Sequence, residues 1–282
     1  MNFIKYHGTG NDFIVVDARK DEKRIDPALI SALCRRNTGV GADGVLFACG
    51  TSTGADAAMR IFNADGSEAE MCGNGIRCLA KYLYEHGGVK KESMFIDTKA
   101  GAKRLGLTVR EGRVMEVEVE IGMPEFAAPS LPSQDNPSEA GKISLRTTGE
   151  EYIEAFCLSL GNPHCVIFVE NVKQAPVPSL GPQIEKHELF PYRTNVEFVQ
   201  VLDASHLAVR VWERGVGETA ACGTGACAAF AAALHAGRGK SPMLITLPGG
   251  DLKVRVDDDG HIYLAGPAVE VYRAVLSPYW EG

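Results

Sequence analysis

The chain has 282 residues, of which 45% are apolar and 23% are charged, and its formal net charge at pH 7 is −7. These proportions are ordinary for a globular protein with one large domain or two domains of average size. The acidic balance argues against a nucleic-acid partner, which would require a basic face. A small anionic substrate stays compatible with it, since a pocket can differ in charge from the surface as a whole.

The sequence predicts a cytoplasmic protein with no membrane partner. Residues 1–12 lack the basic segment and the apolar core of a signal peptide. The longest weakly polar run, residues 220–234, is shorter than a membrane span and consists mostly of Ala and Gly. The eight cysteines are therefore expected to be reduced thiols. They form no Cys-x-x-Cys pair, so no metal site is expected.

The first half of the chain alternates short apolar segments with turns. Asp26 and Pro27 have the residue types of an N-cap and a first helical position, which predicts a helix over residues 27–36. A second helix is expected at about residues 76–85, closed by two glycines. Strands are expected at residues 3–6, 13–17, 45–49, 57–63, 93–98, 102–110 and 114–121.

The second half begins after an irregular connection at residues 124–142, which contains four prolines. Helices are expected at residues 180–187 and directly after Cys222. Strands are expected at residues 150–159, 165–169, 194–201, 207–212, 244–247, 252–257, 261–265 and 268–276. We therefore expect two domains, residues 1–122 and 123–267, with the terminal segment (about 268–282) returning to the first.

One motif occurs twice. Residues 68–75 read Glu-Ala-Glu-Met-Cys-Gly-Asn-Gly, and residues 218–225, 150 positions later, read Glu-Thr-Ala-Ala-Cys-Gly-Thr-Gly. Arg60 recurs as Arg210 at the same offset. The repeat predicts an α+β fold of two pseudo-symmetric domains, each a curled, barrel-like and mostly antiparallel sheet around a central helix, with an active site in the cleft between them. The Ala-rich helix after Cys222 fits such a position, because it has no polar stripe and small side chains let strands approach closely.

Cys72 and Cys222 each lie at the start of a predicted helix. Unpaired backbone N–H groups and the helix dipole stabilise negative charge there. The pKa of a thiol in that position can fall from about 8.5 to between about 3.5 and 7.5. The neighbouring glycines allow a tight entry into the helix and leave the backbone bare for a carboxylate. If the two copies face each other, two thiols and two helix N-termini surround one small anion.

These groups suit the removal of a proton from one face of a carbon and its return on the other face. One cysteine must be a thiolate and the other a thiol, with roles that reverse for the opposite chirality, so the two titrate as a coupled pair. Backbone donors of both helices would hold the charge that develops on a substrate carboxylate. The sequence therefore predicts an amino-acid racemase or epimerase that works without a cofactor.

Six motifs resemble, in order, those of the diaminopimelate epimerase family over nearly the whole chain. They are Tyr6-His-Gly-Thr-Gly-Asn11-Asp-Phe, Phe62-Asn63-Ala-Asp-Gly-Ser, Met71-Cys72-Gly-Asn-Gly-Ile-Arg-Cys78, Leu160-Gly-Asn162-Pro-His164-Cys, Arg193-Thr-Asn195-Val-Glu-Phe and Glu213-Arg214-Gly-Val-Gly-Glu-Thr-Ala-Ala-Cys222-Gly-Thr-Gly. The resemblance implies a cofactor-free, two-cysteine interconversion of LL- and meso-diaminopimelate, for the synthesis of lysine and of peptidoglycan precursors. It also implies a homodimer.

The resemblance assigns roles to single residues of these motifs. Cys72 and Cys222 are expected to be the acid–base pair, and His164 and Glu213 to lie near the thiols and tune them. The expected substrate-binding residues are Asn11, Asn63, Gly73, Asn74, Asn162, Asn195, Glu213, Arg214, Gly223 and Thr224.

These roles agree with the chemistry of diaminopimelate, which carries an amino-acid group at each end. Arg214 can bind a carboxylate bidentately, Glu213 can accept from an ammonium group, and Asn side chains offer both a donor and an acceptor. The first copy has Asn63 and Ala64 where the second has Glu213 and Arg214. Gly44 stands where some family members carry Gln, so at most its backbone is expected to contact the substrate. The symmetric cysteines thus indicate the reaction, and the asymmetric polar residues indicate the substrate.

Other interpretations stay open at this point. A proline racemase or a hydroxyproline epimerase would apply the same chemistry to a substrate with one carboxylate. A binding protein could keep the fold without the activity, and buried structural cysteines could start two helices. A dinucleotide-binding loop is disfavoured, because about ten residues separate the strand that ends at Trp212 from Gly223, where that motif requires a tight turn.

Overall fold

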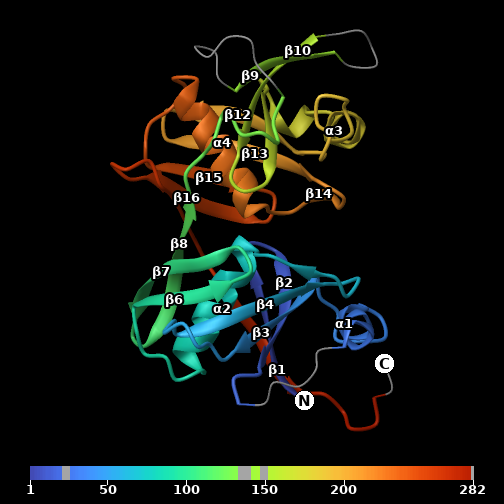
Figure 1. Cartoon of the computed structure of the whole chain (residues 1–282), viewed down its shortest axis with the longest axis vertical. Helices are drawn as coiled ribbons and strands as arrows, with labels where there is room; N and C mark the ends of the chain where they lie inside the picture. The colour runs from blue at the N-terminus through green and yellow to red at the C-terminus, as the bar shows by residue number, and fades with distance from the viewer. Residues whose placement is uncertain (21–25, 133–140, 147–151, 281–282) are drawn as a thin grey trace. The chain divides into compact units, whose positions relative to one another are not determined.

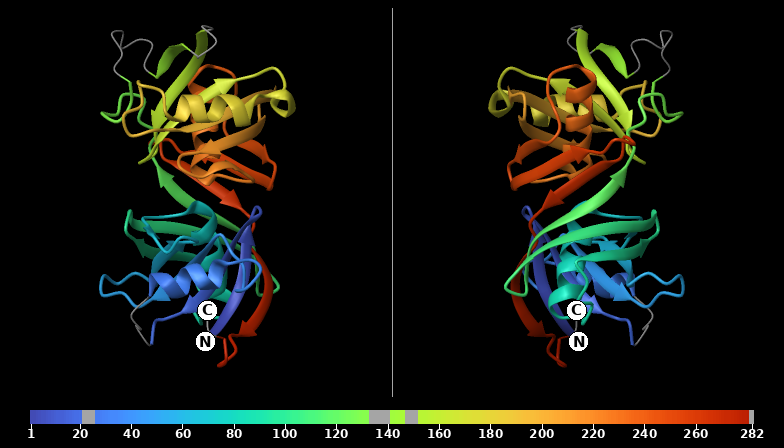
Figure 2. Two further views of the ribbon diagram at one scale, coloured as in Figure 1. Left: turned by 90° about the vertical axis from the view of Figure 1, so that its right-hand side faces the viewer. Right: turned by 90° about the vertical axis from the view of Figure 1, so that its left-hand side faces the viewer.

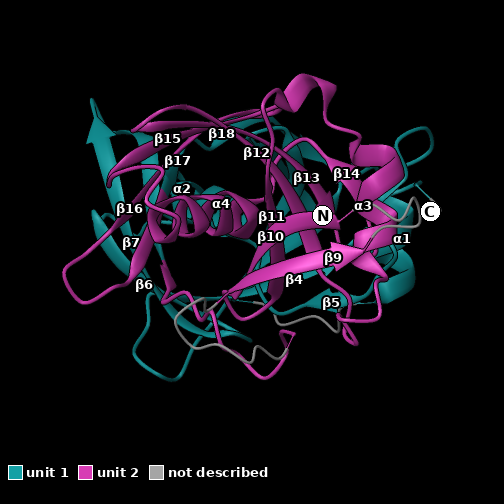
Figure 3. Ribbon diagram, turned by 90° about the horizontal axis from the view of Figure 1, so that it is seen from above, with its two compact units in different colours: residues 1–120, 265–282 teal, residues 121–264 magenta. Residues whose placement is uncertain are grey.

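The computed structural model describes residues 1–20, 26–132, 141–146 and 152–280. The chain forms two compact units: unit 1 comprises Met1–Glu120 and Ala265–Gly282, and unit 2 comprises Ile121–Leu264. Figure 1 labels the helices and strands, and Figure 3 colours them by unit. Among the described residues, no helix is long and apolar enough to cross a membrane.

The sheet of unit 1 is mixed. Its elements are β1 (Asn2–Gly8), β2 (Asn11–Asp17), α1 (Pro27–Cys34), β3 (Gly44–Cys49), β4 (Ala57–Asn63), β5 (Glu68–Ala69), α2 (Gly73–Glu85), β6 (Ser93–Thr98), β7 (Gly101–Arg110), β8 (Arg113–Gly122) and β18 (Val269–Val275). β1 pairs antiparallel with β2 and β18, β2 pairs parallel with β3, and β3 pairs antiparallel with β4. β4 pairs parallel with β6, which continues antiparallel into β7 and β8. Figure 2 shows red β18 beside blue β1.

Unit 2 repeats this pattern. Its elements are β9 (Lys142–Arg146), β10 (Tyr152–Ser159), β11 (Pro163–Phe168), η2 (Val172–Gln174), α3 (Val177–Glu185), β12 (Asn195–Asp203), β13 (His206–Glu213), β14 (Gly217–Thr219), α4 (Gly223–His235), β15 (Met243–Leu247), β16 (Gly250–Val256) and β17 (Ile262–Gly266). β10 pairs antiparallel with β9 and β11, β11 pairs parallel with β12, and β12 pairs antiparallel with β13. β13 then pairs parallel with β15, and β15 antiparallel with β16. The predicted duplicated α+β fold is confirmed.

The central helix of each unit is the element that carries the repeated cysteine. Figure 3 shows α4 surrounded by strands of unit 2, and it contacts β10, β11, β12, β13, β15 and β16. Residues 225–233 are all buried, so small side chains are what allow strands to pack on every side. α2 is more amphipathic: Ile76, Leu79 and Leu83 are fully buried, whereas Lys81 and Glu85 keep part of their surface exposed.

Several predicted boundaries need correction. The helix predicted at residues 27–36 ends at Cys34, and the one predicted at 180–187 spans Val177–Glu185 with Pro182 inside it. Both central helices begin at the first glycine of the repeat, because the preceding cysteine is the N-cap. The prediction missed β5 and β14, which are too short for any periodicity, and β9, which begins at the last residue of the supposedly irregular connection. Residues 150–151 of the predicted strand at 150–159 lie outside the described residues.

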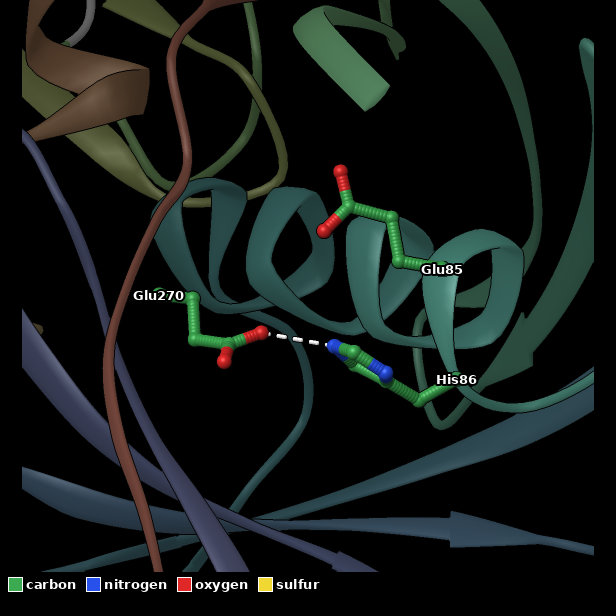
Figure 4. A group of neighbouring side chains, drawn as sticks. All are labelled: Glu85, His86 and Glu270. Carbon is green, nitrogen blue, oxygen red and sulfur yellow. Dashed lines mark hydrogen bonds and ion pairs between the residues drawn. The ribbon is translucent and has the colours of Figure 1, made fainter. Parts of the chain in front are cut away.

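A cluster at the C-terminal end of α2 joins this helix to β18. Figure 4 shows His86 pointing toward Glu270, with Nε2 2.6 Å from Glu270 Oε2. Arg273 donates to Glu270 Oε1 at 2.7 Å. Glu85 accepts from Lys81 at 2.9 Å and from a backbone N–H of β8. The ligand atoms of Glu85, His86 and Glu270 lie within 4.8 Å of one another, but both carboxylates are already bonded to protein donors, so we assign the cluster a structural role.

The pKa of Glu270 predicts how acid destabilises unit 1. Burial opposes ionisation of this carboxyl, but hydrogen bonds from Arg273 and His86 outweigh it and lower the pKa. A lowered folded-state pKa stabilises the fold above the unfolded-state value, about 4.3 for Glu, and this contribution is lost as pH falls through the folded-state value. We therefore expect Glu270→Gln to lose less free energy of unfolding between about pH 6 and pH 3 than the unmodified chain does.

Urea denaturation at a series of pH values measures this loss, with Glu92→Gln, at an exposed position of the same unit, as the control. An equal loss in Glu270→Gln and in the unmodified chain would show that these contacts contribute nothing to stability.

Candidate active site

Each repeated cysteine is the N-cap of a central helix. Cys72 precedes α2 with φ −141° and ψ 121°, and Cys222 precedes α4 with φ −117° and ψ 116°. In both, Sγ accepts a hydrogen bond of 3.4 Å from the backbone N–H three residues later, that of Gly75 or Gly225. This is how an N-cap side chain satisfies an unpaired amide at a helix start. The predicted position of both thiols at helix N-termini is confirmed.

Asn11 and Asn74 lie next to Cys72 in unit 1. The Cys72 thiol is 3.8 Å from Asn11 Oδ1, and Asn74 Nδ2 donates to the same oxygen at 3.3 Å. Asn11 Nδ2 in turn donates to Asp43 Oδ2 at 2.8 Å. Gly73 is the first residue of α2. Three of the four predicted binding residues of unit 1 are therefore grouped at this helix N-terminus.

The fourth, Asn63, ends β4 and is exposed. Its backbone N–H donates to the carbonyl of Ser67 at 2.8 Å, and its Nδ2 donates to the Ser67 hydroxyl at 3.0 Å. Asn63 is paired across the sheet with Gly44. A Cβ on Gly44 would lie 2.5 Å from the carbonyl oxygen of Phe62, so only the backbone of Gly44 can line a site here.

Arg77 is a fully buried cation in the first turns of α2. It donates to the Gly73 carbonyl at 3.1 Å, to Asn74 Oδ1 at 3.0 Å and to the Thr9 hydroxyl at 3.3 Å. Because Arg77 occupies the oxygen of the Asn74 amide, the NH₂ group of Asn74 faces Asn11. Arg77 therefore sets the orientation of a predicted substrate-binding amide.

A chain of polar groups leads away from Cys222 in unit 2. Its thiol lies 3.5 Å from the Thr224 hydroxyl, which also lies 3.5 Å from Asn162 Nδ2. Asn162 Oδ1 is 3.1 Å from His164 Nε2 on β11. His164 Nδ1 is 2.7 Å from Glu197 Oε1 on β12. The structure thus joins Cys222 to two predicted binding residues and to His164.

His164 and Glu197 are both completely buried. The two ring nitrogens of His164 face acceptor oxygens, those of Glu197 and Asn162, so the ring donates from both only as the imidazolium. Glu197 Oε2 has no hydrogen-bond partner among the described residues. This pair therefore buries ionisable groups that are incompletely satisfied, close behind one of the two thiols.

Asn195 is turned inward rather than toward solvent. Its Oδ1 accepts from the backbone N–H of Arg214 at 2.9 Å, and its Nδ2 donates to the Pro163 carbonyl at 3.2 Å. Arg214 itself is exposed, and its guanidinium donates to the Tyr192 carbonyl at 3.2 Å. Both side-chain contacts of Asn195 are thus with backbone groups, and one of these belongs to Arg214.

Glu213 ends β13 and accepts a short hydrogen bond from the Thr219 hydroxyl. Burial raises the pKa of Cys222 well above its ordinary value, and the charges of Glu213 and Glu197 raise it further. Hydrogen bonds from neighbouring groups of α4 offset this only in part. The expectation that a helix N-terminus lowers the thiol pKa is therefore wrong for Cys222, because desolvation and two carboxylates outweigh the helix.

Comparison with known proteins identifies the family. The model of the diaminopimelate epimerase family matches residues 3–127 and 156–271. Diaminopimelate epimerase of Moorella thermoacetica is 47% identical over 275 residues, which cover 97% of this chain and 98% of the relative. The chain belongs to the diaminopimelate epimerase family. Family members from Synechococcus elongatus and, as a chloroplastic enzyme, from rice are 45% and 44% identical, and their alignments cover 96% of this chain and 96% and 79% of the relatives.

Solved structures of other enzymes share the fold of this family. A probable proline racemase from Agrobacterium radiobacter aligns with a TM-score of 0.72 at 16% identity, covering 98% of this chain and 93% of its own. A hydroxyproline epimerase from Agrobacterium vitis aligns with a TM-score of 0.68 at 16% identity, covering 99% and 96%. At such identities the likeness shows the fold alone. The sequence comparisons therefore favour diaminopimelate epimerase over the proline-type enzymes.

Two buried charged residues near the N-cap cysteines, Arg77 in unit 1 and Glu197 in unit 2, were given no role by the sequence reasoning. Both stand in apolar runs: Arg77 follows Ile76 on a central helix, and Glu197 lies between Val196 and Phe198 on a buried strand. A charged residue at a position where periodicity requires an apolar one is the signal that could have found them.

Replacement of Arg77 tests whether its hydrogen bond orients the amide of Asn74. Arg77→Met keeps most of the buried volume but leaves the Gly73 carbonyl and Asn74 Oδ1 without this donor. A hydrogen bond from a charged group contributes about 1.5–3 kcal/mol, so we expect a loss of about that size in the free energy of unfolding. We also expect KM to rise more than kcat falls, because a binding amide is released. Arg104→Met, at an exposed position, is the control, and matching values in both variants would refute the role.

Proposed function

We propose that this chain interconverts LL- and meso-diaminopimelate by moving the α-proton between the thiols of Cys72 and Cys222. The single observation that carries the proposal is that both thiols accept a backbone N–H at the N-terminus of a central helix, in two copies of one motif. Folding does not require cysteine at either N-cap, because Ser or Asp caps a helix as well. Membership of the diaminopimelate epimerase family gives the substrate.

The reaction needs one thiolate and one thiol on opposite faces of the α-carbon. The thiolate removes the proton and becomes a thiol, while the second thiol delivers its own proton to the other face and becomes the thiolate. Each turnover therefore inverts the protonation of the pair, and the reverse reaction starts from the inverted form. General acid–base catalysis by such groups contributes about 10²- to 10⁴-fold to a rate.

The helix N-termini hold the carboxylate next to the reacting carbon. The backbone N–H groups after each cysteine, those of Gly73 and Asn74 and those of Gly223 and Thr224, are the donors proposed for this task. Charge develops on that carboxylate when the α-proton leaves, so fixed donors stabilise the transition state more than the ground state.

The asymmetric polar residues are proposed to bind the end of diaminopimelate that does not react. Arg214 would take its carboxylate and Glu213 its ammonium group. The amides of Asn11, Asn63 and Asn162 would complete recognition, with Asn195 supporting Arg214 through its backbone. A substrate with a single charged end, such as proline, uses none of these groups. The product then serves the synthesis of lysine and of peptidoglycan precursors.

Serine replacements of the two cysteines test the acid–base roles. Cys72→Ser and Cys222→Ser keep an N-cap oxygen but replace the thiol by a much weaker acid, so we expect interconversion to fall by at least about 10²-fold in each. Cys78→Ser and Cys227→Ser, inside the same helices, are the matched controls. NMR of α-proton exchange in D₂O, with LL-diaminopimelate and with proline, is the assay. Turnover at the unmodified rate in either N-cap variant, or exchange into proline alone, would refute the proposal.

We further propose that the chain is a homodimer joined through β18. Val269, Val271 and Val275 lie on this strand, and all three are exposed. Several exposed valines on one ordered strand are typical of an interface. The free state of all eight cysteines fits the cytoplasm, which we propose as the location.

Light scattering after gel filtration tests the dimer. We expect a mass of twice the 30.3 kDa chain, and a shift toward the single-chain mass in Val271→Asp, because a charge in a buried interface is costly. Met115→Asp, at another exposed apolar position of unit 1, should keep the dimer mass. A single-chain mass for the unmodified protein would refute this assembly.

A further inference from the structure

The strand behind each cysteine carries a different residue in the two copies. A Cβ on Gly75, in the first turn of α2, would meet Leu46 Cδ2 at 3.1 Å. A Cβ on Gly225, at the same place in α4, would meet Glu197 Oε1 at 3.0 Å. Glu197 therefore stands where Leu46 stands in the first copy, and a carboxyl replaces a methyl group beside the amide that binds the thiol.

His164, which contacts this carboxyl, also has an apolar counterpart. His164 pairs in parallel with Asn195, and Phe13 pairs in parallel with Gly44 at the same point of the repeated pattern. Phe13 is 2% exposed. The second copy thus has a buried histidine–glutamate pair where the first copy has a buried phenylalanine–leucine pair.

Folding alone does not account for the buried pair in the second copy. Desolvation of two ionisable side chains costs several kcal/mol, and apolar residues of similar volume are often at least as stabilising. Glu197 Oε2, without a hydrogen-bond partner in the described part of the chain, adds to this cost. The apolar pair of unit 1 shows that the fold accepts the alternative. Retention of a costly pair therefore points to a function.

Charged and titratable groups lie around Cys222 and Glu197 on three of the strands that contact α4, namely β11, β12 and β13. Glu197 lies on β12 and Glu213 at the end of β13, and both disfavour a thiolate at Cys222. His164 on β11 contacts Glu197, and the buried thiol of Cys165 also interacts with that carboxyl. Burial raises the pKa of Glu197, and the contact with His164 opposes that rise, so the histidine favours the ionised carboxylate. The Cys222 half therefore surrounds its thiol with two carboxyl groups and with burial.

We propose that the buried carboxyl of Glu197, held by His164, is a positioning residue that keeps the proton on Cys222 in the free enzyme, so that Cys222 is the acid and Cys72 the base of the resting pair. The inference rests on the acid–base roles proposed above. The same pair fixes the substrate-binding amide of Asn162, because His164 occupies its oxygen. One epimer of the substrate reacts with this resting form. The other epimer reacts only with the less populated form, in which the proton is on Cys72.

The sign of the expected pH effect follows from this assignment. The pair loses its first proton from Cys72 and its second from Cys222, and a carboxylate beside Cys222 raises the pKa of the second step. Removal of the Glu197 carboxylate should lower the pKa of this second step. The alkaline limb of the kcat/KM profile should then move to lower pH by about one unit, while the acid limb stays in place.

Alkylation of the individual thiols measures the same effect without turnover. At pH 7 we expect iodoacetamide to modify Cys72 faster than Cys222 in the unmodified enzyme, followed by peptide mass spectrometry. Glu197→Gln should raise the rate at Cys222 by about tenfold and leave Cys72 unchanged, because thiolate is the reactive form. Glu154→Gln, which removes a carboxylate from an exposed position of the same unit, is the control.

A double variant separates this effect from misfolding. Glu197→Leu alone leaves the buried His164 without its carboxyl partner. The double variant His164→Phe with Glu197→Leu instead has the same two residue types that unit 1 has at these positions. We expect the double variant to fold and to reproduce the alkylation rates and the pH profile of Glu197→Gln, since the two residues act as one unit.

Two outcomes are distinguishable. If Cys222→Ser is inactive but Glu197→Gln and the double variant keep the unmodified alkylation rates and alkaline limb, this inference is wrong and the proposed reaction stands. If Cys222→Ser turns over at the unmodified rate, the proposed reaction itself is wrong.

Discussion

The hydrogen bond from a helix backbone N–H to a cysteine sulfur is the contact on which the rest of this structure depends. It occurs twice, from Gly75 to Cys72 and from Gly225 to Cys222, at 3.4 Å in both cases. For it to form, the donor residue must lie against the strand behind it, and in both copies a Cβ on that residue would come within about 3 Å of a strand side chain. Close packing therefore favours glycine at this position, because any larger residue would push the strand side chain aside.

The fold serves this contact by burying the helix that carries it. A central helix wrapped by strands cannot shift along its axis without disturbing every neighbour, so its N-terminus is a rigid place for a reacting group. In α4 the Ala-rich sequence achieves this with small side chains, and in α2 a buried Arg77 bonds the first turn to the loop that contains Thr9. Rigid donors and a rigid thiol cost no reorganisation when charge develops on a substrate.

The features that both halves share could be predicted from the sequence. The features that differ between the halves could be predicted only in outline. The repeated Cys-Gly-x-Gly fixed both N-caps and the two-domain α+β architecture, because a motif with a strict offset places the same local structure twice. Periodicity could not detect β5 or β14, which have two and three residues. It also could not show that Glu197 reaches the first turn of α4, because the packing of α4 against β12, and not spacing along the chain, brings them together. The lowered pKa expected for Cys222 failed for a related reason: burial and the positions of two carboxylates are tertiary facts.

The two-base mechanism requires that solvent hydrogen enters the product and not the recovered substrate, and a single measurement can check this. LL-diaminopimelate is incubated with the enzyme in D₂O, the reaction is stopped early, and the α-deuterium content of the meso product and of the recovered LL substrate is measured by mass spectrometry. If one thiol removes the proton and the other delivers a solvent-derived one, the product carries deuterium and the recovered substrate keeps its proton. Equal deuterium in product and in recovered substrate would mean that one base serves both faces, and would contradict this account.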